Sequence, residues 1–359
     1  MMEYKILDKQ ALAEWQKALA ESAQLIAPVM RPGGEIVFAD VKNPEEIVKD
    51  VDYVNTLIPP KQFVLPQFEP IVEFKSGVGG WSSEPIYDEQ QRIIFGIRPC
   101  DVKAIEFLDQ FFETDFEDIY YLKRRKNTSL ISISCQQPGE NCFCVCADCG
   151  PFIEDGFDVQ LTDIGNDKYL VEIATERGRE LVALSESLFT EAAPEDIAKR
   201  NELSALAETK FKEAKTYFSA GIRKISAERV PEELWQELGD RCLACGGCSY
   251  VCPTCSCFGV NDLRHNGNAT RARCWDSCAL AGFTRMAGGH NPRKEKQDRR
   301  NRRFYHKLSY YYVQRQGKHG CVGCGRCVAV CPGSIGMPTV VEMIRRDELP
   351  STVKKKDEV

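Results

Sequence analysis

Two cysteine runs of identical spacing constrain this chain more than any other feature of its sequence. Both follow the pattern C-x2-C-x2-C-x3-C-P, the first run at Cys242, Cys245, Cys248 and Cys252, and the second at Cys321, Cys324, Cys327 and Cys331. Bacterial ferredoxins bind two [4Fe–4S] clusters with this spacing, and the fourth cysteine of each run ligates the cluster of the other run. The spacing therefore predicts one cluster on Cys242, Cys245, Cys248 and Cys331, and a second on Cys321, Cys324, Cys327 and Cys252.

Zinc is the main alternative for paired C-x2-C motifs, but a zinc site needs only four ligands and no Cys-Pro ending. A disulfide framework is less favoured, because such frameworks are typical of short secreted chains. This chain has 359 residues and 18 cysteines, and its first residues lack the apolar segment of an export signal. The sequence also contains no apolar stretch long enough to span a membrane. We therefore expect a cytoplasmic protein whose cysteines bind metal.

The charge of the chain changes where the cysteine runs begin. Residues 241–359 contain 21 Lys and Arg against 9 Asp and Glu, whereas residues 1–240 contain 26 against 44. This change supports a domain boundary near residue 240. We expect an α+β or α/β domain over residues 1–190, with a cysteine-rich loop at 135–149, and a helical connector over 191–240. A mainly helical dicluster ferredoxin-like domain should follow over 241–345, with a long insert at 256–320, and then a charged tail over 346–359.

Hydrophobic periodicity gives a coarse secondary structure for the first 240 residues. It predicts a helix over residues 9–29 and strands over 92–98 and 129–134. A second helix should cover residues 102–112, with Asp101 as its N-cap. A strand pair is expected over 157–163 and 169–174, followed by mostly helical chain over 177–238.

A second group of cysteines lies in this N-terminal part. Cys100 should lie beside the N-terminus of the helix at 102–112, where the helix dipole favours a thiolate, although a buried structural cysteine is the alternative. The loop after the strand at 129–134 contains five cysteines separated by Pro and Gly, a composition typical of metal-binding loops: Cys135, Cys142, Cys144, Cys146 and Cys149. Cys100 and Cys135 each follow a predicted strand, and carboxyl ends of neighbouring strands meet at one edge of a sheet. We therefore expect these two cysteines to lie close together.

The insert contains four more cysteines and a basic run over residues 293–303. For Cys255, Cys257, Cys274 and Cys278 we favour packing near a cluster and tuning of its potential over a separate metal site. A basic run is usually a solvated helix face, and here it could also offset the negative charge of a cluster. The alternative is that residues 293–303 bind nucleic acid.

Several segments together resemble the β subunit of sulfhydrogenase and the A subunit of anaerobic sulfite reductase, which share a domain. The resemblance spans residues 55–345, and its most specific segments are Arg98-Pro-Cys-Asp101 and Cys142-Phe-Cys144. It implies an iron–sulfur subunit that passes electrons between an NAD(P)-binding flavoprotein subunit and a catalytic partner of the hydrogenase, sulfite reductase or heterodisulfide-reductase type. It also favours a third [4Fe–4S] cluster on Cys100, Cys135, Cys142 and Cys144. A shift in loop register would instead bring in Cys146 or Cys149, which depart from the family pattern, as does Cys274.

The sequence lacks the glycine-rich fingerprints of nucleotide-binding domains. No G-x-G-x-x-G follows a predicted strand, and there is no P-loop. We therefore expect neither flavin nor NAD on this chain and no substrate chemistry on the chain alone. The competing functional class is an iron–sulfur redox sensor that binds nucleic acid or a regulator through residues 293–303.

Overall fold

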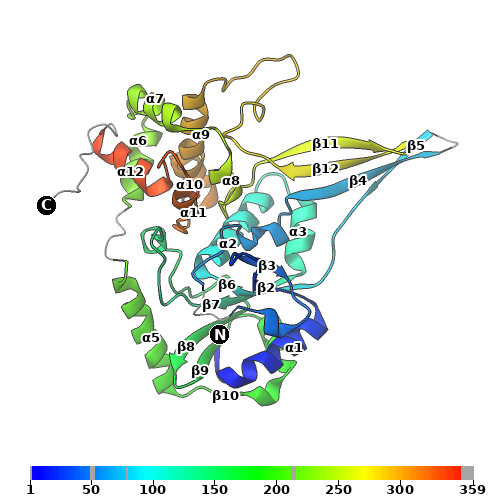
Figure 1. The fold of residues 1–359 in the computed structure, drawn as a ribbon, viewed down its shortest axis with the longest axis vertical. Helices are drawn as coiled ribbons and strands as arrows, with labels where there is room; N and C mark the ends of the chain where they lie inside the picture. Colours follow the sequence, from blue (N-terminus) through cyan, green and yellow to red (C-terminus); the bar gives the residue numbers. More distant parts are fainter. Residues whose placement is uncertain (1, 49–52, 78–79, 212–215, 349–359) are drawn as a thin grey trace. The chain divides into compact units, whose positions relative to one another are not determined.

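The computed structural model describes residues 2–48, 53–77, 80–211 and 216–348 (Figure 1). The chain forms two compact units. Unit 1 comprises Met1–Leu65, Tyr87–Glu213 and Val322–Cys324, and unit 2 comprises Pro66–Ile86, Ala214–Cys321 and Gly325–Val359. Each unit is thus built from segments that are far apart in the sequence. Short 3₁₀ helices cover Lys9–Ala11, Pro44–Glu46, Pro60–Phe63, Cys144–Ala147 and Glu186–Leu188.

Unit 1 is organised around an eight-stranded mixed sheet. Its strand order is β10 (Phe189–Glu191), β1 (Glu3–Asp8), β9 (Lys168–Ile173), β8 (Val159–Gly165), β7 (Thr128–Ile133), β6 (Arg92–Ile97), β2 (Gln24–Met30) and β3 (Ile36–Asp40). Strands β2, β6, β7 and β8 run parallel to one another, whereas β3, β9, β1 and β10 pair antiparallel with their neighbours. The predicted strands at 92–98 and 129–134 and the predicted pair at 157–174 are confirmed.

The first helix of unit 1 is shorter than predicted. Helix α1 (Leu12–Ser22) ends where the predicted helix at 9–29 should have continued, and residues 24–30 form β2 instead. Pro28 cannot donate the backbone hydrogen bond that a helix interior requires, and Leu25 and Ile26 are buried in the sheet. Trp15 of α1 is fully buried, and its Nε1 donates to the Leu181 carbonyl of α4 (Glu176–Ala183) at 2.9 Å. The prediction for residues 23–29 was therefore wrong, because tertiary pairing outweighed local helix propensity.

Helix α2 (Pro99–Glu113) follows β6 directly and begins earlier than predicted. Arg98 is its N-cap residue and Pro99 occupies the first turn, where its missing amide donor costs nothing. Asp101 lies inside the helix, only 1% exposed, so its prediction as the N-cap was wrong. Cys100 consequently lies in the first turn of α2, at the positive end of the helix dipole.

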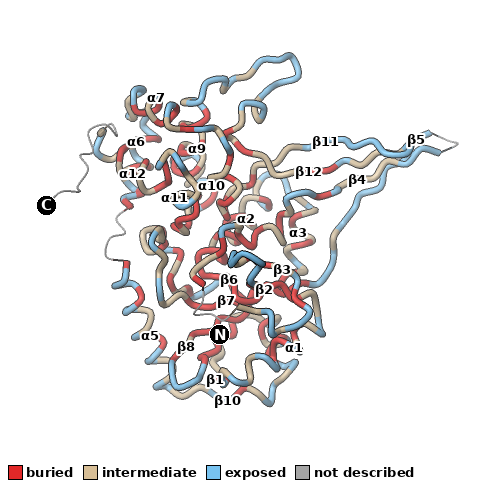
Figure 2. The backbone as a smooth tube through the Cα atoms, viewed as in Figure 1, coloured by how far each residue is buried: buried red, intermediate tan, exposed pale blue. Residues whose placement is uncertain are grey.

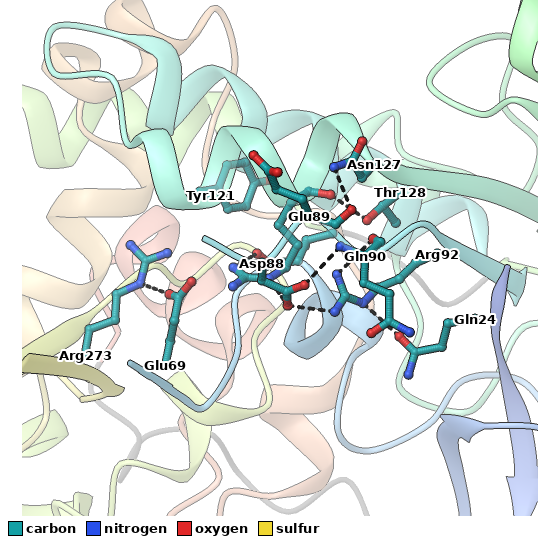
Figure 3. A network of polar contacts seen from close by, with 12 residues as sticks. Gln24, Glu69, Asp88, Glu89, Gln90, Arg92, Tyr121, Asn127, Thr128 and Arg273 are labelled. Carbon is teal, nitrogen blue, oxygen red and sulfur yellow. Dashed lines mark hydrogen bonds and ion pairs between the residues drawn. The ribbon is translucent and has the colours of Figure 1, made fainter. Parts of the chain in front are cut away.

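Two ion-pair networks brace the segments around residues 66–88 (Figure 3). In unit 1, the Asp88 carboxylate accepts from Arg92 of β6 at 2.7 Å and from Arg124 of α3 (Ile119–Lys126) at 3.2 Å. Burial raises the pKa of Asp88, but the two guanidiniums outweigh it and leave that pKa below its usual range. In unit 2, buried Glu69 and Arg273 form an ion pair.

Unit 1 extends further along the chain than the expected domain end at residue 190. Helix α5 (Pro194–Thr209) packs on β8 and β9. Its Arg200 pairs with the buried Glu172 carboxylate of β9, with 3.2 Å between Nη2 and Oε1. The expected helical connector over 191–240 is therefore divided, because its first helix belongs to the sheet domain and its later helices to unit 2.

Unit 2 combines helices with a four-stranded antiparallel sheet. The strand order is β11 (Phe258–His265), β12 (Asn268–Trp275), β4 (Phe68–Gly77) and β5 (Gly80–Pro85), so two distant hairpins pair side by side. Much of this sheet is exposed, β5 throughout (Figure 2). The expected description as mainly helical omits this sheet, because the β4–β12 pairing joins segments about two hundred residues apart, which periodicity cannot link.

Unit 2 also contains helices, two of which lie within the cysteine runs. They are α6 (Phe218–Ser226), α7 (Glu232–Arg241), α8 (Gly247–Tyr250), α9 (Lys296–Leu308), α10 (Tyr310–Gln316), α11 (Arg326–Ala329) and α12 (Met337–Arg346). Helix α9 packs against α6 and α7, and α6 packs against α12. None of the helices in the described residues combines the length and the apolar character that a bilayer span requires.

Candidate iron–sulfur centres

The two cysteine runs adopt the same local backbone. In each run the glycine after the second cysteine has a positive φ, 78° at Gly246 and 76° at Gly325, and a four-residue helix follows. The amide three residues after each glycine closes the turn, at 2.8 Å for Ser249 and 2.9 Å for Val328. A residue with a Cβ adopts this left-handed conformation only at a cost. The glycines thus let the backbone of each run turn tightly between its second and third cysteines.

The ends of the two runs cross within unit 2. The segment after Cys331-Pro comes so close to the first run that a Cβ on Gly333 would collide with the Arg241 carbonyl, one residue before Cys242. Reciprocally, the Thr254 hydroxyl after Cys252-Pro donates to the Gly320 carbonyl at 2.8 Å, one residue before Cys321. This crossing places the fourth cysteine of each run beside the start of the other run, the arrangement that crossed ligation of two clusters requires.

A buried cationic face of α9 lies against these cysteines. Arg300, Arg303 and Lys307 follow helical spacing and are only 2%, 4% and 6% exposed. Arg300 Nη1 lies 3.6 Å from Cys248 Sγ, and Arg303 Nη1 lies 3.8 Å from Cys255 Sγ. Buried cations need anionic partners, and thiolates on an iron–sulfur core supply that charge.

Electrostatics place Arg303 among cysteines of both runs. Burial lowers the pKa of Arg303, but the thiolates of Cys248, Cys255, Cys252 and Cys327 outweigh burial and hold that pKa well above its usual range. Cys248 belongs to the proposed ligands of one cluster, whereas Cys252 and Cys327 belong to those of the other. Arg303 is therefore placed to stabilise negative charge at both centres.

Unpartnered donors indicate that the thiol region suits a further anionic group. Arg300 Nε and Nη2 are buried without a hydrogen-bond partner among the described residues. Buried guanidinium donors left unsatisfied are costly, so this side chain fits a site that holds additional acceptors such as cluster sulfides. Backbone amides also point at sulfur, with Ala244 N lying 3.2 Å from Cys242 Sγ and Met337 N 3.5 Å from Cys327 Sγ.

The four N-terminal candidates converge in unit 1. They line one cavity, here called the cysteine cavity, whose thiol-bearing residues are Cys100, Cys135, Cys142, Cys144 and Cys324. Because β6 and β7 are parallel neighbours, Cys100 and Cys135 follow the same edge of the sheet, as the sequence predicted. Cys142 and Cys144 return to that edge from the loop after β7. Nothing in the sequence indicated that Cys324 of the second run would also line this cavity.

Glycines bring the backbone close to these thiols. A Cβ on Gly150, whose φ is +141°, would lie 3.4 Å from Cys144 Sγ. A Cβ on Gly323, whose φ is +67°, would lie 2.5 Å from the backbone of Cys144 and Phe143. Phe143 N also donates to the Gly323 carbonyl at 2.8 Å. The glycine between Cys321 and Cys324 therefore permits a close approach to the N-terminal cysteine loop.

Two polar residues outside the predicted site hold the cysteine cavity together. Asn55 Nδ2 donates to the Cys324 carbonyl at 3.1 Å. Arg98, 4% exposed, donates to the carbonyl of Val54 at 2.9 Å and to that of Ser134 at 3.4 Å, one residue before Cys135. The Arg98-Pro-Cys-Asp101 motif contained the signal for Arg98, whereas nothing in the sequence singled out Asn55.

The chemistry of the cavity suits a cationic metal core. Burial raises the pKa of the Cys144 thiol well above its usual range, and Cys142, Cys135 and Cys149 raise it further. Without positive charge, gathering thiolates here is unfavourable, and bound iron would remove that penalty. Among the described residues, no three His, Cys, Asp or Glu side chains form a group suited to a single metal ion.

The two loop cysteines left out of the predicted set lie apart from the cavity lining. Cys149 is 1% exposed and its thiol donates to the Ala147 carbonyl at 3.1 Å. Cys146 belongs to the 3₁₀ helix Cys144–Ala147. Neither residue lines the cysteine cavity, so the geometry favours Cys142 and Cys144 over the shifted register.

The fold and these sites define a dicluster iron–sulfur protein. Residues 241–335 match the family model of a 4Fe-4S dicluster domain. The chain is 31% identical over 345 residues to sulfhydrogenase 2 subunit beta of Pyrococcus furiosus, covering 96% of this chain and 99% of that relative. The chain therefore belongs to the sulfhydrogenase β-subunit family, as the resemblance of its motifs indicated. Its role is iron–sulfur electron transfer in an oxidoreductase.

Proposed function

We propose that this chain is the iron–sulfur relay subunit of a multisubunit oxidoreductase. It passes electrons between an NAD(P)-binding flavoprotein subunit and a catalytic partner of the hydrogenase, sulfite reductase or heterodisulfide-reductase type. The relative is named as one subunit of a sulfhydrogenase, which supports a multisubunit assembly. The absence of a glycine-rich fingerprint supports placing flavin and NAD(P) on a partner, and 18 cysteines in a chain of 359 residues, more than a disulfide framework explains, support a location in the reducing cytoplasm.

Three [4Fe–4S] clusters form the relay in this proposal. The first is ligated by Cys242, Cys245, Cys248 and Cys331, the second by Cys321, Cys324, Cys327 and Cys252, and the third by Cys100, Cys135, Cys142 and Cys144. The crossing of the two runs supports the first two sets, and the cysteine cavity supports the third.

The observation that carries the relay is the position of Cys324. This ligand of the proposed second cluster lines the same cavity as the four ligands of the proposed third cluster. A shared lining gives electrons a short path from the N-terminal thiols to the second run. Bound clusters supply one-electron chemistry, which lets a two-electron hydride donor feed a one-electron acceptor.

The remaining residues hold and stabilise this relay. The thiolates bind iron, and the buried guanidiniums of Arg300 and Arg303 offset the negative charge that grows when an electron arrives. In this proposal, neither the cysteines nor the arginines break or form a bond of a substrate.

The nucleic-acid alternative loses support because three arginines of the basic run are buried. Arg299, Arg300 and Arg303 are 6%, 2% and 4% exposed, and Arg299 donates to the Ala279 carbonyl at 3.0 Å. Arginines that face the protein interior cannot neutralise phosphates. The basic run is better explained as the cationic support of the clusters.

The test is reduction of the purified chain by NAD(P)H with and without the flavoprotein that copurifies with it. We expect the pure chain to retain no flavin and to show no reduced-cluster paramagnetic signal until that flavoprotein is added. Stoichiometric flavin on the pure chain, or reduction by NAD(P)H alone, contradicts the proposal.

A further inference from the structure

The ammonium group of Lys307, on α9, lies where the two cysteine runs cross. Only 6% of this residue is exposed. Its Nζ donates to the Thr254 hydroxyl at 2.7 Å and to the Gly320 carbonyl at 2.6 Å. Thr254 follows Cys252 by two residues, and Gly320 immediately precedes Cys321. Lys307 therefore ties together the segments that carry Cys252 and Cys321, both proposed ligands of the second cluster.

The Thr254 hydroxyl connects this ammonium group to the Cys252 sulfur. Thr254 Oγ1 lies 3.3 Å from Cys252 Sγ and 2.8 Å from the Gly320 carbonyl oxygen. A hydroxyl group has one proton to donate, so these two acceptors compete for it. Because Lys307 donates to the Gly320 carbonyl as well as to Thr254 Oγ1, that carbonyl keeps a donor when the hydroxyl proton turns to sulfur. The hydroxyl can thus donate to Cys252 once this residue is a cluster-bound thiolate.

The corresponding position of the second run has no hydroxyl group. The first run ends Cys252-Pro-Thr254, whereas the second ends Cys331-Pro-Gly333. Cys331 is the fourth proposed ligand of the first cluster, so that cluster lacks an equivalent donor at this position. No side chain fits there, because a Cβ on Gly333 would collide with the Arg241 carbonyl. This hydroxyl donor is therefore specific to one of the two ferredoxin-type sites.

The buried cations of α9 differ in the centre that they face. Arg300 Nη1 lies 3.6 Å from the sulfur of Cys248, a proposed ligand of the first cluster. Lys307 lies instead against the segment that carries Cys252. Burial lowers the pKa of Lys307, but the thiolates of Cys252 and Cys255 outweigh burial and hold that pKa above its usual range. The Lys307 ammonium therefore stays charged, and in a buried site its charge favours added negative charge nearby.

We propose that Lys307 and Thr254 together raise the reduction potential of the second cluster by acting on its ligand Cys252. Thr254 donates a hydrogen bond to the ligating sulfur, and Lys307 is the positioning residue that holds Thr254 and supplies positive charge. Hydrogen bonds to the sulfurs and the net charge of the site set the potential of a cluster. Both interactions strengthen when an added electron makes the sulfur more negative. The inference rests on the proposed function for the ligand set of the second cluster.

The experiment is a mediated redox titration of the full chain, purified anaerobically with its clusters bound and followed by paramagnetic resonance. In Thr254→Val, one cluster wave should move to a more negative potential, with about a tenfold change in the oxidised-to-reduced ratio, equivalent to about 59 mV for one electron. Lys307→Met should move the same wave in the same direction. Thr254→Ser keeps the hydroxyl and should match wild type. Arg300→Gln is the matched comparison and should move a different wave, because Arg300 contacts Cys248.

Iron analysis shows which variants keep their clusters, so Thr254→Val decides the question if Lys307→Met does not fold. Unchanged waves in Thr254→Val at wild-type iron content overturn the inference, and so does a shift of the same wave by Thr254→Val and Arg300→Gln. Unchanged waves in Lys307→Met at wild-type iron content overturn the role of Lys307. Mediators deliver the electrons, so the titration needs no flavoprotein. The expected shifts in a chain that its flavoprotein cannot reduce support this inference and contradict the proposed relay.

Discussion

Replacing Gly323 by alanine tests the contact between the second run and the N-terminal cysteine loop. The added Cβ would lie 2.5 Å from the Cys144 backbone, and the residue must keep a φ of +67°. The left-handed conformation costs about 1–2 kcal/mol for a residue with a Cβ, and forcing backbone apart adds about 1–3 kcal/mol. We expect a total of about 2–5 kcal/mol, relieved by movement of the Cys144 loop. Iron should fall from about twelve atoms per chain toward eight.

Gly267→Ala is the matched control for this substitution. Gly267 has a φ of +79°, but a Cβ there meets nothing within 4 Å, so the control carries the conformational cost without the collision. The assay is iron and acid-labile sulfide per chain, together with alkylation of Cys144 in the folded protein. Equal iron in both variants, with Cys144 protected in both, would refute the argument that this close approach holds the third site.

Three further predictions concern other parts of the structure. Cys245→Ser should remove one [4Fe–4S] signal from the paramagnetic spectrum and destabilise residues 241–359, because cluster binding is linked to folding; an unchanged spectrum would exclude Cys245 as a ligand. Arg303→Gln removes a positive charge and should make the cluster potentials more negative by tens of millivolts, since about 1.4 kcal/mol corresponds to about 59 mV for one electron. The control is Arg302→Gln, which removes the same charge beside Tyr312 and should leave the potentials near wild type. Burial raises the pKa of Glu172, and Arg200 only partly opposes this rise. The Glu172 carboxyl therefore binds more protons in the folded chain than in the unfolded chain. The free energy of unfolding should fall as the pH rises from about 4.3 through the raised pKa. Glu172→Gln should remove that slope in urea unfolding, whereas Arg200→Met should cost about 3–5 kcal/mol by leaving the carboxylate unpaired.

The spacing of residues in the sequence predicted those parts of the site that are built from one short stretch of chain. The two C-x2-C-x2-C-x3-C-P runs predicted paired loops, and Gly246 and Gly325 fold them alike. The apolar runs before Cys100 and Cys135 predicted neighbouring strands, and β6 and β7 are parallel partners. The loop and strand predictions each depend on a short stretch of chain, and strands that follow one another in an α/β sheet usually lie side by side.

Features that join distant segments of the chain could not be predicted from the sequence. The pairing of β4 with β12 joins residues 68–74 to 269–274, and no local pattern indicates which hairpins will meet. For the same reason, the sequence did not indicate that Cys324 and Asn55 would line the cysteine cavity. The basic run was misleading in a different way, because its composition resembles a solvated face while Arg300 and Arg303 point inward. A buried cationic helix face differs from a solvated one by its anionic partners. The partners of Arg300 and Arg303 are Cys248 and Cys255, which lie far earlier in the sequence.

The most direct test of the relay is anaerobic iron, sulfide and zinc analysis of the chain purified from its complex. Two [4Fe–4S] clusters require about eight iron atoms per chain and three require about twelve. The account predicts a value near twelve, equal acid-labile sulfide, and protection of Cys100, Cys135, Cys142 and Cys144 from alkylation in the folded protein. A value near eight, with zinc absent and these four thiols reactive, would contradict it.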